Sequence, residues 1–231
     1  MTLLMILIFE VYTLRNPSIK NSSMFICPSN NHSCLQSNPA CKLRLSIVKL
    51  HFATSNTNKL RELSTLLEHE LISVPLDLQE IQTTDLHELL KFKLQQAYEE
   101  LHAPVIVEDT SLYFDAWNEL PGPLIKWFLT GLGLEGIVQA LSEFEDKSAQ
   151  AVCCLAFTDD GKTMHFFEGK LKGLIVEPRG SRNFGWDAIF QATGQQQTFG
   201  EMSAEEKNAI SPRGKAAAEF KQSLRLQAKQ R

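Results

Sequence analysis

The feature that most constrains the fold is a regular alternation of apolar patterns that begins at Leu45. Short apolar runs typical of strands occur at residues 45–54, 71–76, 104–107, 151–158, 163–168 and 171–176. Apolar residues at helical spacing occur at residues 58–68, 86–101 and 134–144. Strands that alternate with helices and end in an antiparallel meander predict an α/β fold, with a mixed β-sheet flanked by helices.

Local signals place the ends of several of these elements. Asp85 and Glu88 form a D-x-x-E capping box in front of the long helix. The sequence at 159–161, Asp-Asp-Gly, predicts a hairpin between two strands. Ser211 followed by Pro212 predicts the cap and the first residue of a C-terminal helix.

The chain divides near residue 45. Residues 16–41 contain 14 Asn, Ser or Pro residues among 26, and such a segment cannot bury enough apolar surface to offset the entropy lost on ordering. The apolar segment 2–9 lacks the positively charged region that begins a signal peptide. We therefore expect residues 1–45 to be a disordered or non-native extension, and residues 46–231 to form the functional domain.

Composition narrows the classes of function. With 23 basic and 27 acidic side chains, the chain lacks the positive charge of proteins that bind nucleic acid polymers. No apolar run is long enough to span a membrane. The cysteine count is odd, and the spacing of Cys27, Cys34 and Cys41 matches no zinc motif. Cys153 and Cys154 lie in an apolar run, which favours buried thiols and a reducing, cytoplasmic setting.

The first candidate site is Thr54-Ser55-Asn56-Thr57-Asn58-Lys59, between a predicted strand and a predicted helix. Hydroxyls, amides and free backbone N–H groups at a helix N-terminus can bind an anion, and Lys59 adds a positive charge. The glycines of a Walker loop are missing. The segment is therefore either a phosphate site or a well-capped helix with a solvated lysine.

The second candidate site consists of carboxylates. Glu108 and Asp109 directly follow the predicted strand 104–107, and ligands commonly bind at the carboxyl end of strands in α/β sheets. Two acids in such a place suit Mg²⁺, although helix capping or a surface salt bridge would explain them equally well. Glu80 could supply a further carboxylate.

Aromatic and charged residues form two further candidate groups. Asn183-Phe184-Gly185-Trp186-Asp187 could stack a base and accept a hydrogen bond from its ring N–H, although tryptophan is more often part of a core. Lys207 and Arg213 could bind a base or a phosphate, or could be solvated charges. Ser203 nearby is explained by a capping box with Glu206. Jointly, the candidate groups suggest a triphosphate and magnesium site with an aromatic slot.

Several motifs occur in order between about residues 47 and 224. They are Thr54-Ser55-Asn56-x-x-Lys59, Val107-Glu108-Asp109-Thr110, Leu120-Pro121-Gly122-Pro123-x-Ile125-Lys126-Trp127-Phe128, Phe144-Glu145-Asp146-Lys147-Ser148-Ala149, Pro178-Arg179-Gly180, Phe184-Gly185-Trp186-Asp187, and Glu201-Met202 leading to Glu206-Lys207-Asn208. Together they resemble the inosine triphosphate pyrophosphatase family, and its eukaryotic branch most closely.

This resemblance implies a homodimer with an elongated α/β fold, in which two lobes surround a central cleft. It implies Mg²⁺-dependent hydrolysis of ITP, dITP and XTP to the monophosphate and pyrophosphate, with Mn²⁺ as an alternative ion. The implied partner is a purine nucleoside triphosphate, and neither a nucleic acid polymer nor a membrane is implied.

The resemblance also implies a role for each candidate residue. Glu80 and Asp109 would bind Mg²⁺. Asp109 would also orient or deprotonate the attacking water, and Lys59, the other catalytic residue, would bind the phosphates. Phe184 and Trp186 would pack against the base. The other substrate-binding residues would be Thr54, Ser55, Asn56, Thr57, Asn58, Lys93, Thr110, Lys126, Gly185, Asp187, Lys207 and Arg213.

One position departs from the family pattern. Where the family has Ser-His-Arg, this chain has Ser211-Pro212-Arg213. Proline suits the first turn of a helix, but it cannot donate a hydrogen bond to a base. Loss of such a contact costs about 0.5–3 kcal/mol, or about 2- to 150-fold in affinity. We therefore expect weaker binding or blurred base selection and not a loss of the chemistry.

Two alternatives remain open at this point. A Maf-like pyrophosphatase would act on pyrimidine or modified nucleotides, but the Phe-Gly-Trp-Asp and Lys-Trp-Phe segments speak against it. A nucleotide-binding protein with little turnover is suggested by Pro212, whereas the presence of Lys59, Glu80, Asp109 and Lys207 speaks against it.

Overall fold

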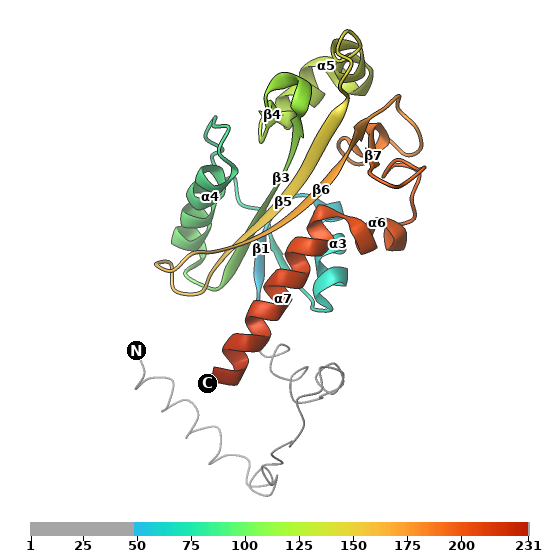
Figure 1. The fold of residues 1–231 in the computed structure, drawn as a ribbon. Helices are drawn as coiled ribbons and strands as arrows, with labels where there is room; N and C mark the ends of the chain where they lie inside the picture. The colour runs from blue at the N-terminus through green and yellow to red at the C-terminus, as the bar shows by residue number, and fades with distance from the viewer. Residues whose placement is uncertain (1–48, 231) are drawn as a thin grey trace, which may run out of the picture. The chain divides into compact units, whose positions relative to one another are not determined.

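The computed structural model describes residues 49–230, and the predicted extension 1–45 lies outside the described residues. The elements are β1 (His51–Ala53), α3 (Thr57–Leu67), β2 (Ile72–Val74), α4 (Leu86–Leu101), β3 (Val105–Phe114), η3 (Asp115–Trp117), β4 (Pro121–Gly122), α5 (Ile125–Ala140), β5 (Ser148–Thr158), β6 (His165–Ile175), η4 (Asp187–Ile189), β7 (Phe190–Ala192), α6 (Ala204–Ile210) and α7 (Pro212–Gln230) (Figure 1). None of the helices in this part of the chain is both long enough and apolar enough to span a membrane.

The strands form one mixed sheet in the order β2-β1-β3-β5-β6-β7, with β4 paired to β3. Strands β2, β1 and β3 are parallel, because helical crossovers connect them. Strands β3, β5, β6 and β7 pair in antiparallel fashion. The predicted α/β fold with a mixed sheet flanked by helices is thereby confirmed.

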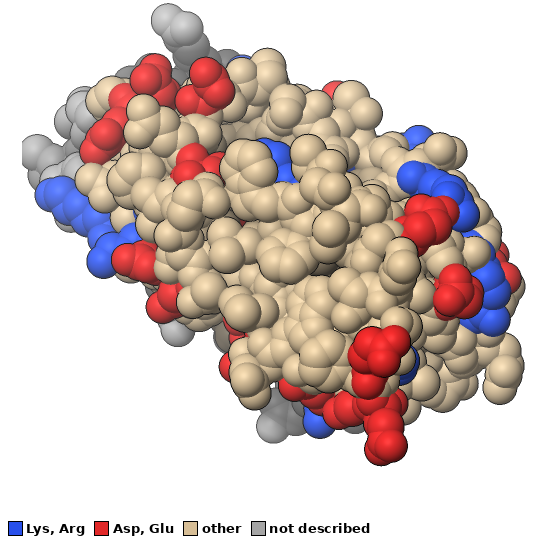
Figure 2. All heavy atoms as spheres, turned by 90° about the horizontal axis from the view of Figure 1, so that it is seen from above, with Lys and Arg blue, Asp and Glu red and all other residues tan. Residues whose placement is uncertain are grey.

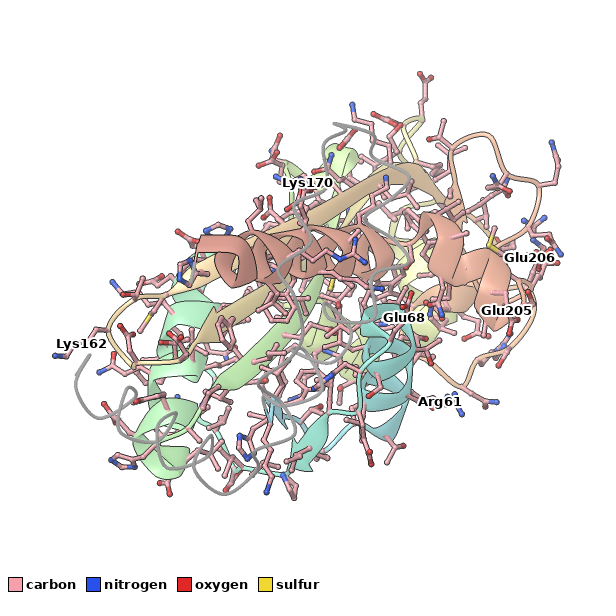
Figure 3. The ribbon with its side chains drawn as sticks, turned by 90° about the horizontal axis from the view of Figure 1, so that it is seen from below. Arg61, Glu68, Lys162, Lys170, Glu205 and Glu206 are labelled. Atoms are coloured by element: carbon pink, nitrogen blue, oxygen red, sulfur yellow. The ribbon has the colours of Figure 1, made fainter. Side chains whose placement is uncertain are left out.

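Side-chain alternation along the long strands gives each face of the sheet its own core. On one face, Val105, Val107 and Cys154 pack with α4. On the other face, Ile106 and Leu155 pack with α3 and α7. Figure 3 shows α7 lying along this second face, with α3 beside it. Helices therefore cover the sheet on both sides.

A separate core surrounds the far half of β3 and β5. Phe114 of β3 and Ala149 of β5 pack there with Ile137 of α5, Trp186 and Phe190. The two long strands thus run through cores at both of their ends, which corresponds to the predicted pair of lobes.

Several predicted element boundaries were wrong. The strand expected at 45–54 covers His51–Ala53, and residues 45–48 lie outside the described residues. The strand expected at 104–107 is ten residues long, because every residue of β3 pairs with β5, and so Glu108 and Asp109 lie inside the strand and not after it. The strands expected at 163–168 and 171–176 form the single strand β6. The helix expected at 134–144 is the second part of α5, which Gly133 interrupts with a φ of 69°.

The predicted caps are present, with one modification. Asp85 Oδ1 accepts hydrogen bonds from the N–H groups of His87 and Glu88 at 2.8 and 3.1 Å. Glu88 does not bind the N–H of Asp85 directly, as it would in a simple capping box. Instead, the hydroxyl of Thr83 donates to Glu88 Oε2 at 2.7 Å and accepts from the N–H of Asp85 at 3.1 Å. The first turn of α4 is therefore held by three side chains. The predicted caps of α6 and α7 are confirmed.

The absence of a side chain at Gly169 of β6 allows α7 to begin directly against the sheet. A Cβ atom at this position would lie 1.9 Å from the carbonyl oxygen of Pro212. We expect Gly169→Ala to lower the free energy of unfolding in urea by about 1–3 kcal/mol, because the start of α7 must move away. Gly131→Ala is the control, since its Cβ would meet no atom within 4 Å. Equal losses in the two variants would contradict the importance of this close approach.

Candidate active site

A cavity of about 840 Å³ lies between the cores. Its walls come from the β1–α3 loop, α4, the middle of β3, the start of α5, residues 183–187 and the α6–α7 junction. The structure brings every predicted site residue to this cavity except Thr57, which is exposed at the start of α3 and is not part of the lining. Pro212 lies in the wall as well.

The cavity reaches β3 where one edge of the strand is uncovered. Within the described chain, β1 pairs only with the first two residues of β3, and β4 pairs with Leu112 and Tyr113. The stretch between them is paired only to β5 on its other side. Glu108 and Asp109 lie on this stretch, and strand alternation directs them to opposite faces. Glu108 and Asp109 therefore lie just beyond the point where the parallel pairing of β1 with β3 ends, although β3 itself continues.

The β1–α3 loop caps α3 as predicted, but its lysine is not the solvated side chain of the capped-helix alternative. Asn56 Oδ1 caps α3 by accepting from the N–H groups of Asn58 and Lys59 at 3.0 and 3.1 Å. Lys59 is not solvated, because its Nζ lies 3.2 Å from Glu108 Oε1. Burial alone would lower the pKa of Lys59, but the carboxylates of Glu108 and Asp109 raise it above its ordinary value. Lys59 is therefore a fixed cation in the cavity wall.

A row of alternating charges crosses the cavity next to this lysine. Lys93 Nζ of α4 donates to Glu80 Oε1 at 3.0 Å and to Asp109 Oδ1 at 3.5 Å. Lys126 Nζ of α5 donates to the second oxygen of Glu80 at 3.2 Å. Two carboxylates from different segments thus converge on one ammonium group. Their hard oxygen atoms are also the kind of ligand that Mg²⁺ takes in proteins.

The two carboxylates differ in their electrostatic surroundings. Burial raises the pKa of Asp109 above its ordinary value, although Lys59 and Lys93 oppose this shift. Burial would also raise the pKa of Glu80, but Lys93 and Lys126 outweigh burial and lower it. Burial therefore shifts the pKa of Asp109 in the direction that suits a group that accepts a proton, whereas the lysines shift the pKa of Glu80 in the opposite direction.

The aromatic end of the cavity is built around Lys207. Its Nζ lies 2.6 Å from Asp187 Oδ2 and 4.3 Å from the centre of the Phe184 ring. Burial raises the pKa of Asp187, whereas Lys207 opposes the shift. Trp186 is only 7% exposed and packs against Phe199. Phe184 is therefore the more accessible of the two predicted aromatic residues, and Trp186 belongs to the wall behind it.

Arg213, at the start of α7, is fixed by carboxylates and is not a solvated charge. Its Nε and Nη2 donate to the two oxygens of Glu108 at 2.8 and 2.9 Å, and its Nη1 donates to Glu62. Burial would raise the pKa of Glu108, but Arg213 and Lys59 hold it well below its ordinary value. Both oxygens of Glu108 therefore bind Arg213, whereas Asp109 and Glu80, the predicted metal ligands, converge on Lys93.

Sequence reasoning missed Glu62. This residue accepts from both Arg213 and Lys207, the latter at 3.2 Å, so that it connects α3 to both basic residues of the C-terminal segment. The available signal was its position three residues after Lys59, which places both on one face of a helix.

The chain has relatives among known proteins. The Ham1 family model matches residues 50–223. The inosine triphosphate pyrophosphatase of Kluyveromyces lactis is 47% identical over 182 residues, which cover 75% of this chain and 94% of that protein. The inosine triphosphate pyrophosphatase of Saccharomyces cerevisiae is 47% identical over 185 residues, with the same two coverages.

Solved structures agree with these relatives. A HAM1 protein from Coxiella burnetii superposes with a TM-score of 0.69 at 27% identity, over 77% of this chain and 98% of that one. A nucleoside-triphosphatase, or dITP/XTP pyrophosphatase, from Mycobacterium abscessus superposes with a TM-score of 0.61 at 30% identity, over 75% and 98% of the chains. The resemblance seen in the sequence motifs is thereby confirmed, and the chain belongs to the Ham1 family.

Proposed function

We propose that this chain is a hydrolase that cleaves the non-standard purine nucleoside triphosphates ITP, dITP and XTP to the monophosphate and pyrophosphate, and so cleanses the nucleotide pool. One observation carries the proposal. A single cavity holds Lys59, Lys93 and Lys126 beside two carboxylates at one end, and Phe184 with an acid–lysine pair at the other. The names of the relatives point to the same substrates.

The residues present fit a bound Mg²⁺ ion. Glu80 and Asp109 would hold it, because their carboxylates already face the common cation Lys93. Mn²⁺ is the alternative ion, since it takes the same oxygen ligands. Such an ion neutralises phosphate oxygens and stabilises pyrophosphate as it leaves.

The phosphate end would work through charge and positioning. Lys59, Lys93, Lys126 and the polar 54–58 loop would bind the phosphate oxygens, whose negative charges otherwise repel a nucleophile. Asp109 would orient the attacking water and accept its proton. The water oxygen bonds to the α-phosphorus, the bond from this phosphorus to the β-bridging oxygen breaks, and pyrophosphate leaves with that oxygen. A carboxylate whose pKa is raised by burial is a better base for this step than an exposed one.

The aromatic end would select the base. Phe184 offers a ring face for stacking. Asp187 can accept a hydrogen bond from a purine N1–H, and Lys207 can donate to the neighbouring 6-oxo group. Adenine presents an acceptor and a donor at these two positions instead, so both contacts would be lost with ATP.

We also propose that residues 46–231 act as a homodimer in the cytoplasm. The support for the dimer is an apolar surface at β4 and α5, where Leu120, Trp127 and Leu132 are 44%, 54% and 48% exposed. Figure 2 shows the face seen from above as largely uncharged, with acidic and basic side chains toward its rim. Large apolar side chains exposed on neighbouring segments of the fold often mark a protein interface.

The test is pyrophosphate release from ITP, dITP, XTP, ATP and GTP with Mg²⁺, and then with EDTA. We expect the three non-standard substrates to react at least about 10-fold faster than ATP, because ATP leaves the polar groups of the site unpaired. EDTA should stop all release. The assay is repeated with dTTP and UTP, and preference for either of these would indicate the Maf-like alternative. No release from any nucleotide would indicate a binding protein.

The same assay with Pro212→His examines the departure from the family pattern. Because residue 212 is the first residue of α7 and lines the cavity, a histidine there can face a base without disturbing the helix. We expect the natural chain to be active, with the variant improving affinity or selectivity by about 2- to 150-fold. If only the variant is active, the natural chain is a degraded enzyme.

A further inference from the structure

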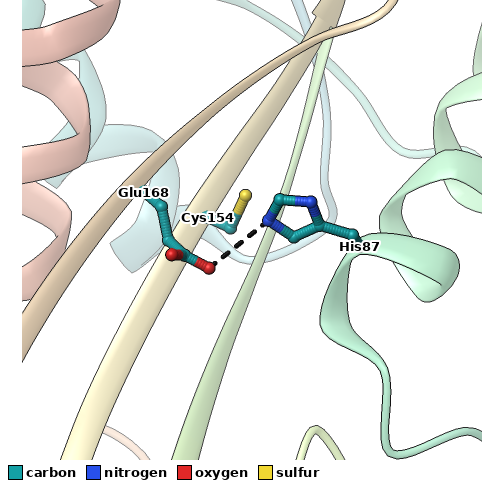
Figure 4. Close-up of side chains that lie close together, drawn as sticks. All are labelled: His87, Cys154 and Glu168. Carbon is teal, nitrogen blue, oxygen red and sulfur yellow. Dashed lines mark ion pairs between the residues drawn. The ribbon is translucent and has the colours of Figure 1, made fainter.

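Three side chains able to bind a metal converge outside the proposed active site. His87 Nε2, Cys154 Sγ and a carboxylate oxygen of Glu168 all lie within 4.8 Å of one another. Figure 4 shows the His87 ring directed at Glu168, with Cys154 beside them. The distance from His87 Nε2 to Glu168 Oε1 is 3.4 Å, which equals the edge of a tetrahedron with metal–ligand bonds of about 2.1 Å.

The fold positions all three ligands. Cys154 of β5 and Glu168 of β6 are direct cross-strand partners, so their side chains stand next to each other on the α4 face of the sheet. His87 lies in the capped first turn of α4, and its ring stacks on Phe166 at 4.9 Å. Lys170 binds Glu168 Oε2 at 2.7 Å, which leaves Oε1 directed at the histidine. Lys170 thus holds the carboxylate of Glu168 from the side away from the histidine, and such a partner orients a ligand for a metal.

The chemistry of the donors selects the ion. Thiolate and imidazole groups favour Zn²⁺ and disfavour Mg²⁺, whose preferred ligands are oxygen atoms. Three protein ligands with an open fourth position are typical of accessible zinc sites. The His87 side chain is 52% exposed, so a water molecule can reach that position. As the bond between Sγ and the ion forms, the thiol proton passes to solvent.

We propose that His87, Cys154 and Glu168 form a Zn²⁺ site that ties the start of α4 to β5 and β6. The site does not depend on the proposed hydrolysis, but it adjoins the groups that would perform it. Asp109 is the cross-strand partner of Cys154 on the other side, and Lys93 is carried by the same helix as His87. An ion bound here would therefore fix the helix that presents Lys93 to the two acids of the cavity.

The experiment uses the full chain with Cys27, Cys34 and Cys41 replaced by serine, because these thiols lie outside the described residues and would also bind metal. Co²⁺ is added to the metal-free protein in the presence of excess Mg²⁺, and thiolate-to-cobalt charge transfer is followed in the near ultraviolet. Zn²⁺ is then added to displace the cobalt. The variants are Cys154→Ser, His87→Gln and the control Cys153→Ser, whose thiol lies on the opposite face of β5.

We expect one equivalent of Co²⁺ to give the thiolate band, and one equivalent of Zn²⁺ to abolish it. The band should persist in Cys153→Ser and disappear in Cys154→Ser. His87→Gln should weaken Co²⁺ binding by about 10- to 100-fold. Because His87 is half-exposed, this variant should fold, and it tests the proposal if Cys154→Ser fails to fold. Absence of the band in the parent, its persistence in Cys154→Ser, or unchanged affinity in His87→Gln would overturn the proposal.

Discussion

Asp109→Asn should lower the rate of pyrophosphate release from ITP by about 10²- to 10⁴-fold and leave the fold intact. An asparagine keeps the shape of the side chain, but it cannot take a proton from water and carries no charge for a metal. The fold should survive, because the substitution removes an ionised group from a buried place and leaves an oxygen that can still accept from Lys93. The measurements are kcat with saturating ITP and the midpoint of thermal unfolding.

The matched control is Asp159→Asn, which makes the same chemical change at an exposed position in the β5–β6 connection. It should leave kcat unchanged. Asp109→Asn with more than a tenth of the parent activity would show that Asp109 does not act on the water.

Local sequence was sufficient for the parts of the fold that short-range physics determines. Asp85 and Ser211 cap helices where predicted, because a side-chain oxygen needs only the next turn as its partner. The apolar stripe from Leu86 to Leu101 likewise predicted α4. The length of β3 was missed, because Glu108, Asp109 and the residues after them continue the strand only through pairing with β5. That pairing joins residues about 45 apart in the sequence, and no local pattern reports it.

For the candidate site, likewise, the sequence predicted the residues but not the contacts among them. Motifs identified nearly all of its residues, and the structure brings them to one cavity. The contacts among them could not be predicted, because they join distant segments: Glu108 to Arg213, Glu80 to Lys126, and Glu62 to Lys207. The local residue pattern did not separate Glu108 from its neighbour Asp109, and only the family resemblance assigned the metal to Asp109. Strand alternation separates them, since one side chain faces Arg213 and the other faces Lys93.

The contact between Glu108 and Arg213 should dominate the stability of the site. The Glu108 side chain is 0% exposed and Arg213 is 5% exposed, so removal of one partner leaves a charge that water cannot reach. We expect Arg213→Met to lower the free energy of unfolding in urea by about 3–5 kcal/mol. The double variant with Glu108→Gln should recover about 0.5–3 kcal/mol of this loss, because the buried charge that had lost Arg213 as its main partner is gone. A glutamine can still accept from Lys59 and from the hydroxyl of Thr110.

Lys221→Met provides the control on the same helix, because Lys221 Nζ lies 2.8 Å from a carboxylate of Glu68 that is 64% exposed. Its loss should cost no more than about 1 kcal/mol. The two pairs should also differ with pH. The pKa of Glu108 is held below its unfolded value, so its stabilisation is complete at neutral pH and declines as the pH falls below about 4.3. Arg213→Met should reduce this part of the acid sensitivity, since Lys59 is then the main cation left to lower the pKa of Glu108. If Arg213→Met costs no more than Lys221→Met, water reaches Glu108 and the contact is not a buried one.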